Sequence, residues 1–483
     1  MSRIVIGPFN RVEGDLEVAL DVMDGVVREA RVCANLYRGF EQILLGRPSE
    51  DALAIAPRIC GICSVSQSLA VVAMLRAAQG ATPAPNGLLL TNIAHAAENI
   101  ADHLTHFYLF FMPDFARASY AGRAWFEAIE ARFKATAGTC LREALPARAG
   151  LLEIMGIIAG KWPHSLAFRA GGVAHAPDLS EKVRLLGIIA RFRAFLEQSL
   201  FGASLEAVTA LGSMANLDAF VERGGSAGDF AAFVKIASDL RLEAMGCGPG
   251  PVMSSGAYLG PGGHYFPAGV FDARTGALSD FNLAKVREDV AHSFMRDSDP
   301  EPARAQTLPA LDRDGAYSFA KAPRFSGQPM EVGALARQAV AGHPLIRELI
   351  TRAGASNVFA RVVARLLEIA LLTQAAETWA RQIELKEKFC APDAPARDGA
   401  ALGCVEAARG TLGHWASLRD DRYTAYQIIA PTTWNFSPRD SAGRPGPLEF
   451  ALQGLEVGDD GAASVAVQHI VRSFDPCMVC TAH

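Results

Sequence analysis

Two C-x-x-C pairs near opposite ends of the chain constrain its fold most strongly. The first is Cys60-Gly-Ile-Cys63 and the second is Cys477-Met-Val-Cys480. Each pair presents two sulfurs to one ion, and four thiolates form the soft ligand set that suits nickel, zinc or iron–sulfur. Because Cys63 and Cys477 lie 414 positions apart, we expect the two ends of the chain to meet at one buried metal site inside a large fold.

The cysteine spacings alone leave three other interpretations open. A zinc knuckle uses pairs that lie roughly 15–20 residues apart, which this separation does not fit. A thioredoxin-like redox pair matches C-G-I-C ahead of a helical segment, but it leaves the second pair unexplained. Buried cysteines can also pack simply as small hydrophobic side chains. We interpret the remaining cysteines in that last way: Cys33, Cys140, Cys247, Cys390 and Cys404.

The hydrophobic pattern predicts an α+β fold that is mostly helical. After a first strand at the N-terminus, apolar residues alternate from Leu16 to Val22 and are followed by Asp24-Gly25, which indicates a β-hairpin. Three segments are apolar at helical spacing and predict long helices of a central bundle. These segments are 88–112, 182–202 and 356–388, and small β elements are expected elsewhere.

We expect one large body with three parts. Residues 1–46 form an N-terminal β-hairpin lobe, residues 47–390 form the helical bundle core, and residues 391–483 form a C-terminal lobe that carries the second cysteine pair. Stretches rich in proline, glycine and aspartate are interpreted as loops on the rim of this body. They lie at 297–309, 391–400 and 437–447.

Charge and composition exclude several classes of partner. The net charge is −5 and charged residues of both signs are interspersed, so neither nucleic acid nor an anionic membrane surface is an expected partner. No apolar run reaches the roughly 18 residues that a membrane span needs. The N-terminal segment lacks the apolar core of a signal peptide, and the cysteines form no dense disulfide framework. We therefore expect a cytoplasmic protein.

Seven motifs, taken together, resemble the large subunit of nickel–iron hydrogenases from end to end. They are RVEGD at 11–15, YRGFE at 37–41, RxCGxC at 58–63, DHLTHFY at 102–108, EAARGTLGHW at 406–415, APTTWNFSPRD at 430–440 and DPCxxCxxH at 475–483. The resemblance implies that family's fold and heterolytic cleavage of H2. This chain has no further cysteine set spaced for an iron–sulfur cluster, so electrons from H2 need another route out. The resemblance therefore also implies a partner small subunit that carries iron–sulfur clusters.

The same resemblance assigns the four cysteines to a nickel–iron centre. All four would bind nickel, with Cys60 and Cys477 as terminal ligands. Cys63 and Cys480 would bridge nickel to an iron that carries two cyanides and one carbon monoxide. Four anionic sulfurs suit nickel with an open position for a gas ligand.

The family's capping residues also have counterparts in this chain. Arg409 matches the arginine over the iron ligands, Thr432 matches a hydroxyl donor to cyanide, and Asp102 and Asp475 match the carboxylates that orient the arginine. A carboxylate inside so apolar a helix as that of Asp102 needs a cationic partner. Ala408 replaces the proline that usually precedes the arginine, so we expect Arg409 to be held less rigidly.

Two further sets of residues follow from the resemblance. Glu13 matches a glutamate that relays a proton away from Cys477, whose sulfur is the base. Glu41, His483 and the backbone carbonyl of Ile428 match the ligands of a second cation. That cation would be Mg²⁺, or Fe²⁺ in its place, because oxygen-rich coordination fits a hard ion.

Three departures from the ordinary family pattern point to its regulatory, H2-sensing branch. Gln67 stands where uptake enzymes have a histidine, and Ile62 and Phe110 stand where the gas channel usually has valine and leucine. Both larger side chains would narrow the channel and exclude O2 better than H2. We therefore expect an oxygen-tolerant enzyme.

Three functions are compared on these grounds. The first is a regulatory hydrogenase of low turnover that signals H2 through the small subunit and a sensor histidine kinase. The alternative is an ordinary uptake hydrogenase that feeds electrons to a respiratory chain. A structural subunit of a proton-pumping complex, derived from hydrogenases, would have lost the nickel cysteines, so the retention of all four argues against it.

Overall fold

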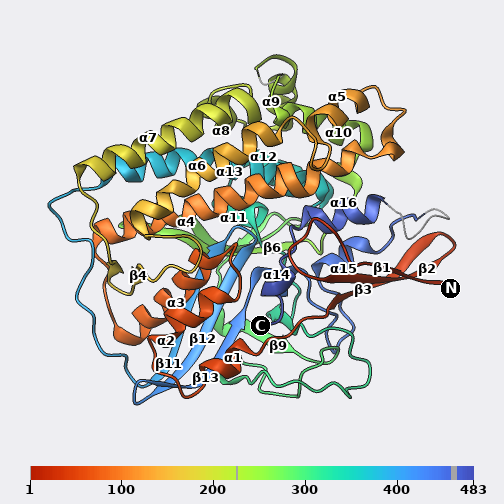
Figure 1. The fold of residues 1–483 in the computed structure, drawn as a ribbon. Coiled ribbons are helices and arrows are strands. Elements are labelled where there is room, and N and C mark those ends of the chain that lie inside the picture. The colour runs from red at the N-terminus through yellow and green to blue at the C-terminus, as the bar shows by residue number, and fades with distance from the viewer. Residues whose placement is uncertain (1, 225–226, 458–464) are drawn as a thin grey trace.

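The computed structural model describes residues 2–224, 227–457 and 465–483. At its N-terminus, β1 (Ser2–Ile6), β2 (Leu16–Met23) and β3 (Val26–Ala34) form an antiparallel sheet in that order. Asp24 and Gly25 make the turn with φ of 54° and 72°, a conformation that favours such residues. The predicted hairpin is confirmed, and it projects from one side of the molecule (Figure 1).

Long helices form the largest layer of the molecule (Figure 1). α4 (Pro85–Thr105) packs against α6 (Leu141–Ile158) and α13 (Val358–Gln382), and α7 (Leu179–Phe195) packs against both α6 and α13. A π-helical turn at His106–Phe111 continues α4, and another at Leu196–Leu200 continues α7. These helices confirm two of the predicted segments. α4 is buried almost all round, whereas α7 buries one face and exposes the other.

The third predicted helix is shorter than expected. Residues 356–388 were predicted to be helical throughout, but α13 has 25 residues and ends at Gln382. Asn357 begins it by accepting a hydrogen bond from the Ala360 backbone, as N-cap residues do. Beyond Gln382 the sequence is rich in Glu and Lys and mostly exposed. Between residues 383 and 388 only Ile383 is buried, and the side chain of Asn86 donates to the Glu384 carbonyl outside the helix.

The remaining elements surround this layer. The other helices are α1 (Phe40–Leu44), α2 (Asp51–Ile55), α3 (Ser64–Gln79), α5 (Phe126–Phe133), α8 (Leu205–Thr209), α9 (Met214–Ala219), α10 (Asp229–Leu240), α11 (Ala334–Ala341), α12 (Pro344–Ala353), α14 (Pro431–Asn435), α15 (Pro447–Leu452) and α16 (Val465–Ser473). The other strands are β4 (Phe168–Arg169), β5 (Gly172–Val173), β6 (Pro251–Gly260), β7 (Gly263–Asp272), β8 (Ala277–Ser279), β9 (Val286–Asp289), β10 (Ala322–Phe325), β11 (Gly399–Ala407), β12 (Gly410–Arg419) and β13 (Arg422–Ile429).

A second antiparallel sheet, with the order β11-β12-β13, packs on α3 and brings late sequence against early sequence. A Cβ at Gly403 would lie 2.2 Å from the Ala70 carbonyl oxygen, so only glycine permits this close approach. The contact fixes α3, which begins directly after Cys63, against the strands that flank Arg409. Among the described residues, no helix is both long and apolar enough to cross a membrane.

Candidate metal centre

The four predicted cysteine sulfurs meet at one point inside the molecule. Cys60 Sγ lies 3.6 Å from Cys477 Sγ, and Cys63 Sγ lies 3.3 Å from Cys480 Sγ. Cys477 and Cys480 are 3.0 Å apart across a short 3-10 turn. All four are free thiols. The prediction that both ends of the chain build one cysteine cluster is confirmed.

The chemistry of this cluster fits a soft divalent metal. Hydrogen bonds from the neighbouring thiols, that of Cys477 first, lower the pKa of Cys60 well below its ordinary value. Burial raises the pKa of Cys480 well above its ordinary value. Four such thiols cannot all ionise side by side without a cation, because adjacent thiolates repel and are poorly solvated. A bound metal removes that penalty, and a four-sulfur set suits nickel, zinc or iron–sulfur.

Arg38 ties the two cysteine segments together, a role that sequence reasoning missed. One guanidinium nitrogen donates to the Ile59 and Val479 carbonyls at 2.6 Å each, and each of these residues directly precedes a metal-site cysteine. The guanidinium also stacks over Phe40, 4.8 Å from the ring centroid. The only signal in the sequence is the place of Arg38 within YRGFE, next to the expected cation ligand Glu41.

Arg409 sits between the two expected carboxylates and is almost completely buried. Its guanidinium donates to Asp102 at 2.6 Å and to Asp475 at 3.1 Å, and its Nε donates to the Asp475 carbonyl at 2.8 Å. Burial raises the pKa of Asp102 to about 8. Burial also acts to raise the pKa of Asp475, but the positive groups around it, Arg409 first among them, together lower the pKa. Each carboxylate keeps one buried oxygen without a partner.

Thr432 and Ala408 lie beside this arginine and the second cysteine pair. The Thr432 hydroxyl accepts a hydrogen bond from the Cys477 backbone at 3.2 Å, which leaves its own proton available to another acceptor. The Ala408 carbonyl accepts from the buried Arg337 at 2.9 Å. The segment before Arg409 is therefore anchored by Arg337, although it lacks the rigid proline.

Glu13 lies alongside Cys477, as the resemblance implies. The Glu13 carbonyl accepts from the Met478 backbone at 2.7 Å, and the Glu13 backbone donates to the Pro476 carbonyl at 3.3 Å. Burial, and then the nearby Cys60, raise the pKa of the Glu13 carboxyl. A carboxyl whose pKa is raised toward neutrality is suited to exchange protons.

The three expected ligands of the second cation surround one small cavity of about 10 Å³. The His483 Nδ1 lies 3.0 Å from a Glu41 oxygen, and Ile428 lines the same cavity. The second oxygen of Glu41 and the Nε2 of His483 are buried without a partner. Two orphaned ligand atoms, a carboxylate oxygen and an imidazole nitrogen, could bind a divalent cation. The Gly39 backbone fixes the C-terminus by donating to the His483 carbonyl at 2.8 Å.

The three departures from the family pattern occupy different settings. Gln67 is fully buried, and its side-chain oxygen lies 2.9 Å from the Nε2 of His414. The sequence predicts no role for His414, although this histidine belongs to the motif EAARGTLGHW. Ile62 is half-buried against the main core. Phe110 is half-buried in the π-helical turn after α4, where its carbonyl accepts from Arg11 at 3.0 Å.

Known proteins resemble this chain along its whole length. The family described as nickel-dependent hydrogenase matches residues 38–131 and 136–483. The periplasmic NiFeSe hydrogenase large subunit of Desulfomicrobium baculatum is 30% identical, covering 100% of this chain and 95% of that protein. The uptake hydrogenase large subunit of Rhodobacter capsulatus is 26% identical, with coverage of 100% and 95%. The reduced Ni-Fe-Se hydrogenase structure from D. vulgaris Hildenborough superposes with a TM-score of 0.85 at 29% identity, covering 100% of both chains.

Proposed function

Since the chain belongs to the family of nickel-dependent hydrogenases, we propose that it is the large subunit of an uptake hydrogenase that feeds electrons from H2 to a respiratory chain. As a hydrogenase large subunit it binds and cleaves H2. The observation that carries this function is the convergence of four cysteine sulfurs from both ends of the chain. Similarity to the Rhodobacter capsulatus uptake subunit supports the uptake role. The sequence motifs alone made this role the alternative to a regulatory hydrogenase.

Each side chain around the cysteines would have a distinct chemical role in the cleavage of H2. When bound by the four sulfurs, nickel and iron supply the place where H2 is polarised and split. The Cys477 sulfur would accept the proton, and the carboxyl of Glu13, whose backbone pairs with Pro476 and Met478 on either side of that cysteine, would carry the proton onward. The Arg409 guanidinium places a fixed positive charge at the same site. Thr432 keeps a free hydroxyl proton for a small acceptor ligand.

Electrons from H2 need an exit that this chain does not contain. Within the described ranges, one group of three or more metal-ligating side chains is found, and it consists of Cys60, Cys63 and Cys480 of the same centre. A small subunit with iron–sulfur clusters would supply the exit. For the second cavity, we propose Mg²⁺ on Glu41, His483 and the Ile428 carbonyl.

A sensory role remains the second candidate, because Gln67, Ile62 and Phe110 all depart from the uptake pattern. In that case the enzyme would turn over slowly and pass the H2 signal through the small subunit to a histidine kinase.

One experiment separates the two roles. The complex with its small subunit is purified, its nickel content is measured, and infrared bands of iron-bound carbon monoxide and cyanide are recorded. We expect nickel near one per chain, these bands, and steady H2 oxidation with a dye acceptor. Absence of nickel and bands would refute hydrogenase function. If both are present but turnover is very slow and an added kinase responds to H2, the sensory role replaces the uptake role.

A further inference from the structure

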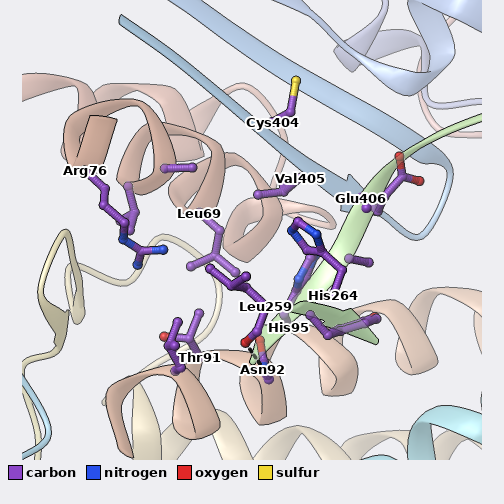
Figure 2. Close-up of a pocket in the computed structure, with 16 residues that line it drawn as sticks. Leu69, Arg76, Thr91, Asn92, His95, Leu259, His264, Cys404, Val405 and Glu406 are labelled. Carbon is purple, nitrogen blue, oxygen red and sulfur yellow. Dashed lines mark hydrogen bonds between the residues drawn. The ribbon is translucent and has the colours of Figure 1, made fainter. Parts of the chain in front are cut away.

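A second cavity lies away from the cysteine cluster and has no part in the chemistry above. It has a volume of about 160 Å³ and is lined by α3, α4, β11 and the β6–β7 hairpin. Figure 2 shows its polar side chains: the Arg76 guanidinium on one side and the imidazoles of His95 and His264 on the other. Leu69 and Leu259 contribute apolar walls. A cavity of this size admits a molecule of only a few heavy atoms.

Arg76 brings an uncompensated positive charge to this cavity. Its Nε donates to the Ala170 carbonyl at 3.0 Å, which leaves four other N–H groups of the guanidinium. Burial lowers the pKa of Arg76, and no neighbouring carboxylate raises it again. An arginine stays charged even so. A half-buried guanidinium without a counter-ion gains strongly from an anion bound within hydrogen-bond distance.

The opposite wall offers one neutral donor, the His264 imidazole, and no competing acid. Burial lowers the pKa of His95 to about 3 and also lowers that of His264, so both rings are neutral at pH 7. Glu406 lines the cavity, but its carboxylate points away from the cavity (Figure 2) and accepts hydrogen bonds from Ser255 and Arg337 at 2.9 Å each.

The position of His264 depends on a glycine. A Cβ at Gly256 would lie 2.9 Å from the His264 ring nitrogen, and Gly256 has a φ of 91°. Any other residue there would be strained and would displace the imidazole from the cavity. The His264 ring therefore occupies the space that the missing side chain of Gly256 leaves free.

We propose that this cavity binds a small organic carboxylate, with its oxygens on the Arg76 guanidinium. A planar guanidinium binds a carboxylate through two parallel hydrogen bonds. The leucine walls accept a short alkyl chain, which inorganic anions lack, and the neutral His264 imidazole supplies a further hydrogen bond. No proton or electron is transferred at this site.

The site has a direct connection to the metal centre. His95 lies 3.3 Å from the Ser66 hydroxyl, which donates to Glu98 at 2.9 Å. Glu98 in turn accepts from the Val65 and Ser66 backbones at 2.8 Å each, and these residues form the first turn of α3 after Cys63. An anion that moves the His95 ring would therefore act on the segment that holds a metal ligand. This consequence rests on the proposed function, whereas binding itself does not.

Calorimetric titration of the purified two-subunit complex with propionate tests the proposal at constant ionic strength. We expect saturable binding in the parent and at least about tenfold weaker binding in Arg76→Gln, because a charge-assisted pair is lost. Arg76→Lys should recover part of the affinity, since lysine keeps the positive charge but cannot form the two parallel hydrogen bonds of a guanidinium. Arg184→Gln, which removes an exposed arginine of α7, is the matched control and should bind like the parent.

Phosphate and chloride titrations complete the test. Phosphate binding that is weaker than propionate binding and equally sensitive to Arg76→Gln supports the proposal. The proposal is overturned if the parent shows no saturable propionate binding, if chloride competes as well as propionate, or if Arg184→Gln weakens binding as much as Arg76→Gln. A complex that binds propionate but does not cleave H2 would refute the proposed function and leave this site standing.

Discussion

At the scale of single residues, the site depends on side chains whose surroundings change their chemistry. Glu13 illustrates this, because a glutamate beside a strand is ordinarily a solvated surface residue. Here its backbone pairs with Pro476 and Met478, on either side of Cys477, and burial raises the pKa of its carboxyl. The tertiary contact converts an ordinary carboxylate into a group suited to proton transfer.

The first prediction concerns this carboxyl. Glu13→Gln should retain nickel and fold normally, because the amide keeps the shape of the side chain. It should lose proton exchange, since an amide cannot relay a proton as a carboxyl does. The measurement is exchange between D2 and water at matched nickel content, with the exposed Asp15→Asn as control. Exchange at the parental rate in Glu13→Gln would remove Glu13 from the pathway.

The second prediction concerns oxygen. We hypothesise that Ile62 and Phe110 narrow the gas path, since Ile62 stands between two metal cysteines and Phe110 lies two turns beyond Asp102. The double variant Ile62→Val, Phe110→Leu should fold at a cost of about 1–3 kcal/mol. It should bind nickel and oxidise H2, but its activity should decay in air while that of the parent persists.

A matched control makes the same two exchanges elsewhere. Ile129→Val, Phe133→Leu alters buried residues of α5 and should leave oxygen tolerance unchanged. If the activity of the Ile62→Val, Phe110→Leu variant survives prolonged O2 exposure as well as that of the parent, oxygen tolerance does not come from Ile62 and Phe110.

At the scale of elements, buried polar side chains join segments that the hydrophobic pattern does not relate. Arg337 of α11 is fully buried and donates to Glu368 of α13, to Glu406 of β11, and to the carbonyls of the two residues after Glu406. Removal of one partner from such a network leaves an uncompensated buried charge, which costs roughly 3–5 kcal/mol. The network therefore fixes the segment that presents Arg409.

A third prediction follows from a buried acid that joins α15 to β3. Glu449 accepts from the Val32 backbone at 3.0 Å and from the Tyr317 hydroxyl at 2.7 Å, and burial raises its pKa to about 7. An acid whose pKa is raised on folding stabilises the fold at low pH, and this stability is lost as the pH rises from about 4.5 to above 7. The loss amounts to about 3 kcal/mol.

The test compares thermal unfolding of the parent and Glu449→Gln at several pH values. Glutamine retains an acceptor for Val32 and cannot ionise. We expect the midpoint of the parent to fall between pH 5 and pH 8 more steeply than that of the variant, at a fixed scan rate. Parallel pH profiles would show that Glu449 is already ionised in the fold.

At the scale of the whole molecule, the metal site closes the chain upon itself. The paired sulfurs Cys60 and Cys477 are 417 positions apart, so a metal that binds both removes much of the freedom of the unfolded chain. The hairpin, the helical layer and the C-terminal segment all contribute to one continuous hydrophobic core. Metal loading and global stability are therefore expected to be coupled.

The fourth prediction is that Cys477→Ser or Cys480→Ser abolishes nickel binding, because a hydroxyl is a poor ligand for a soft site. Each variant should also unfold at least about 5 °C below the loaded parent, since the long loop is no longer closed. Cys247→Ser, at a half-buried cysteine outside the cluster, should retain nickel and the parental midpoint. Full nickel content in both cluster variants would refute the ligand assignment.

The sequence by itself determined the cysteine cluster, the N-terminal hairpin and two of the three long helices. The hairpin and the helices depend on local chemistry, because an Asp-Gly turn and apolar periodicity each specify their structure within a few residues. For the cluster, each C-x-x-C spacing is local, and the meeting of the two pairs followed from the ligand count that one metal site needs. The end of α13 was missed because the Asn86 side chain, almost three hundred positions away in sequence, binds the chain just beyond Gln382.

Only the tertiary structure decided three further polar contacts around the site. Arg38 bridges both cysteine segments, His414 meets Gln67, and Arg337 anchors the segment before Arg409. Each of these contacts joins residues far apart in the chain, and no local pattern encodes such a pairing. It arises because a buried donor must find an acceptor wherever packing places one.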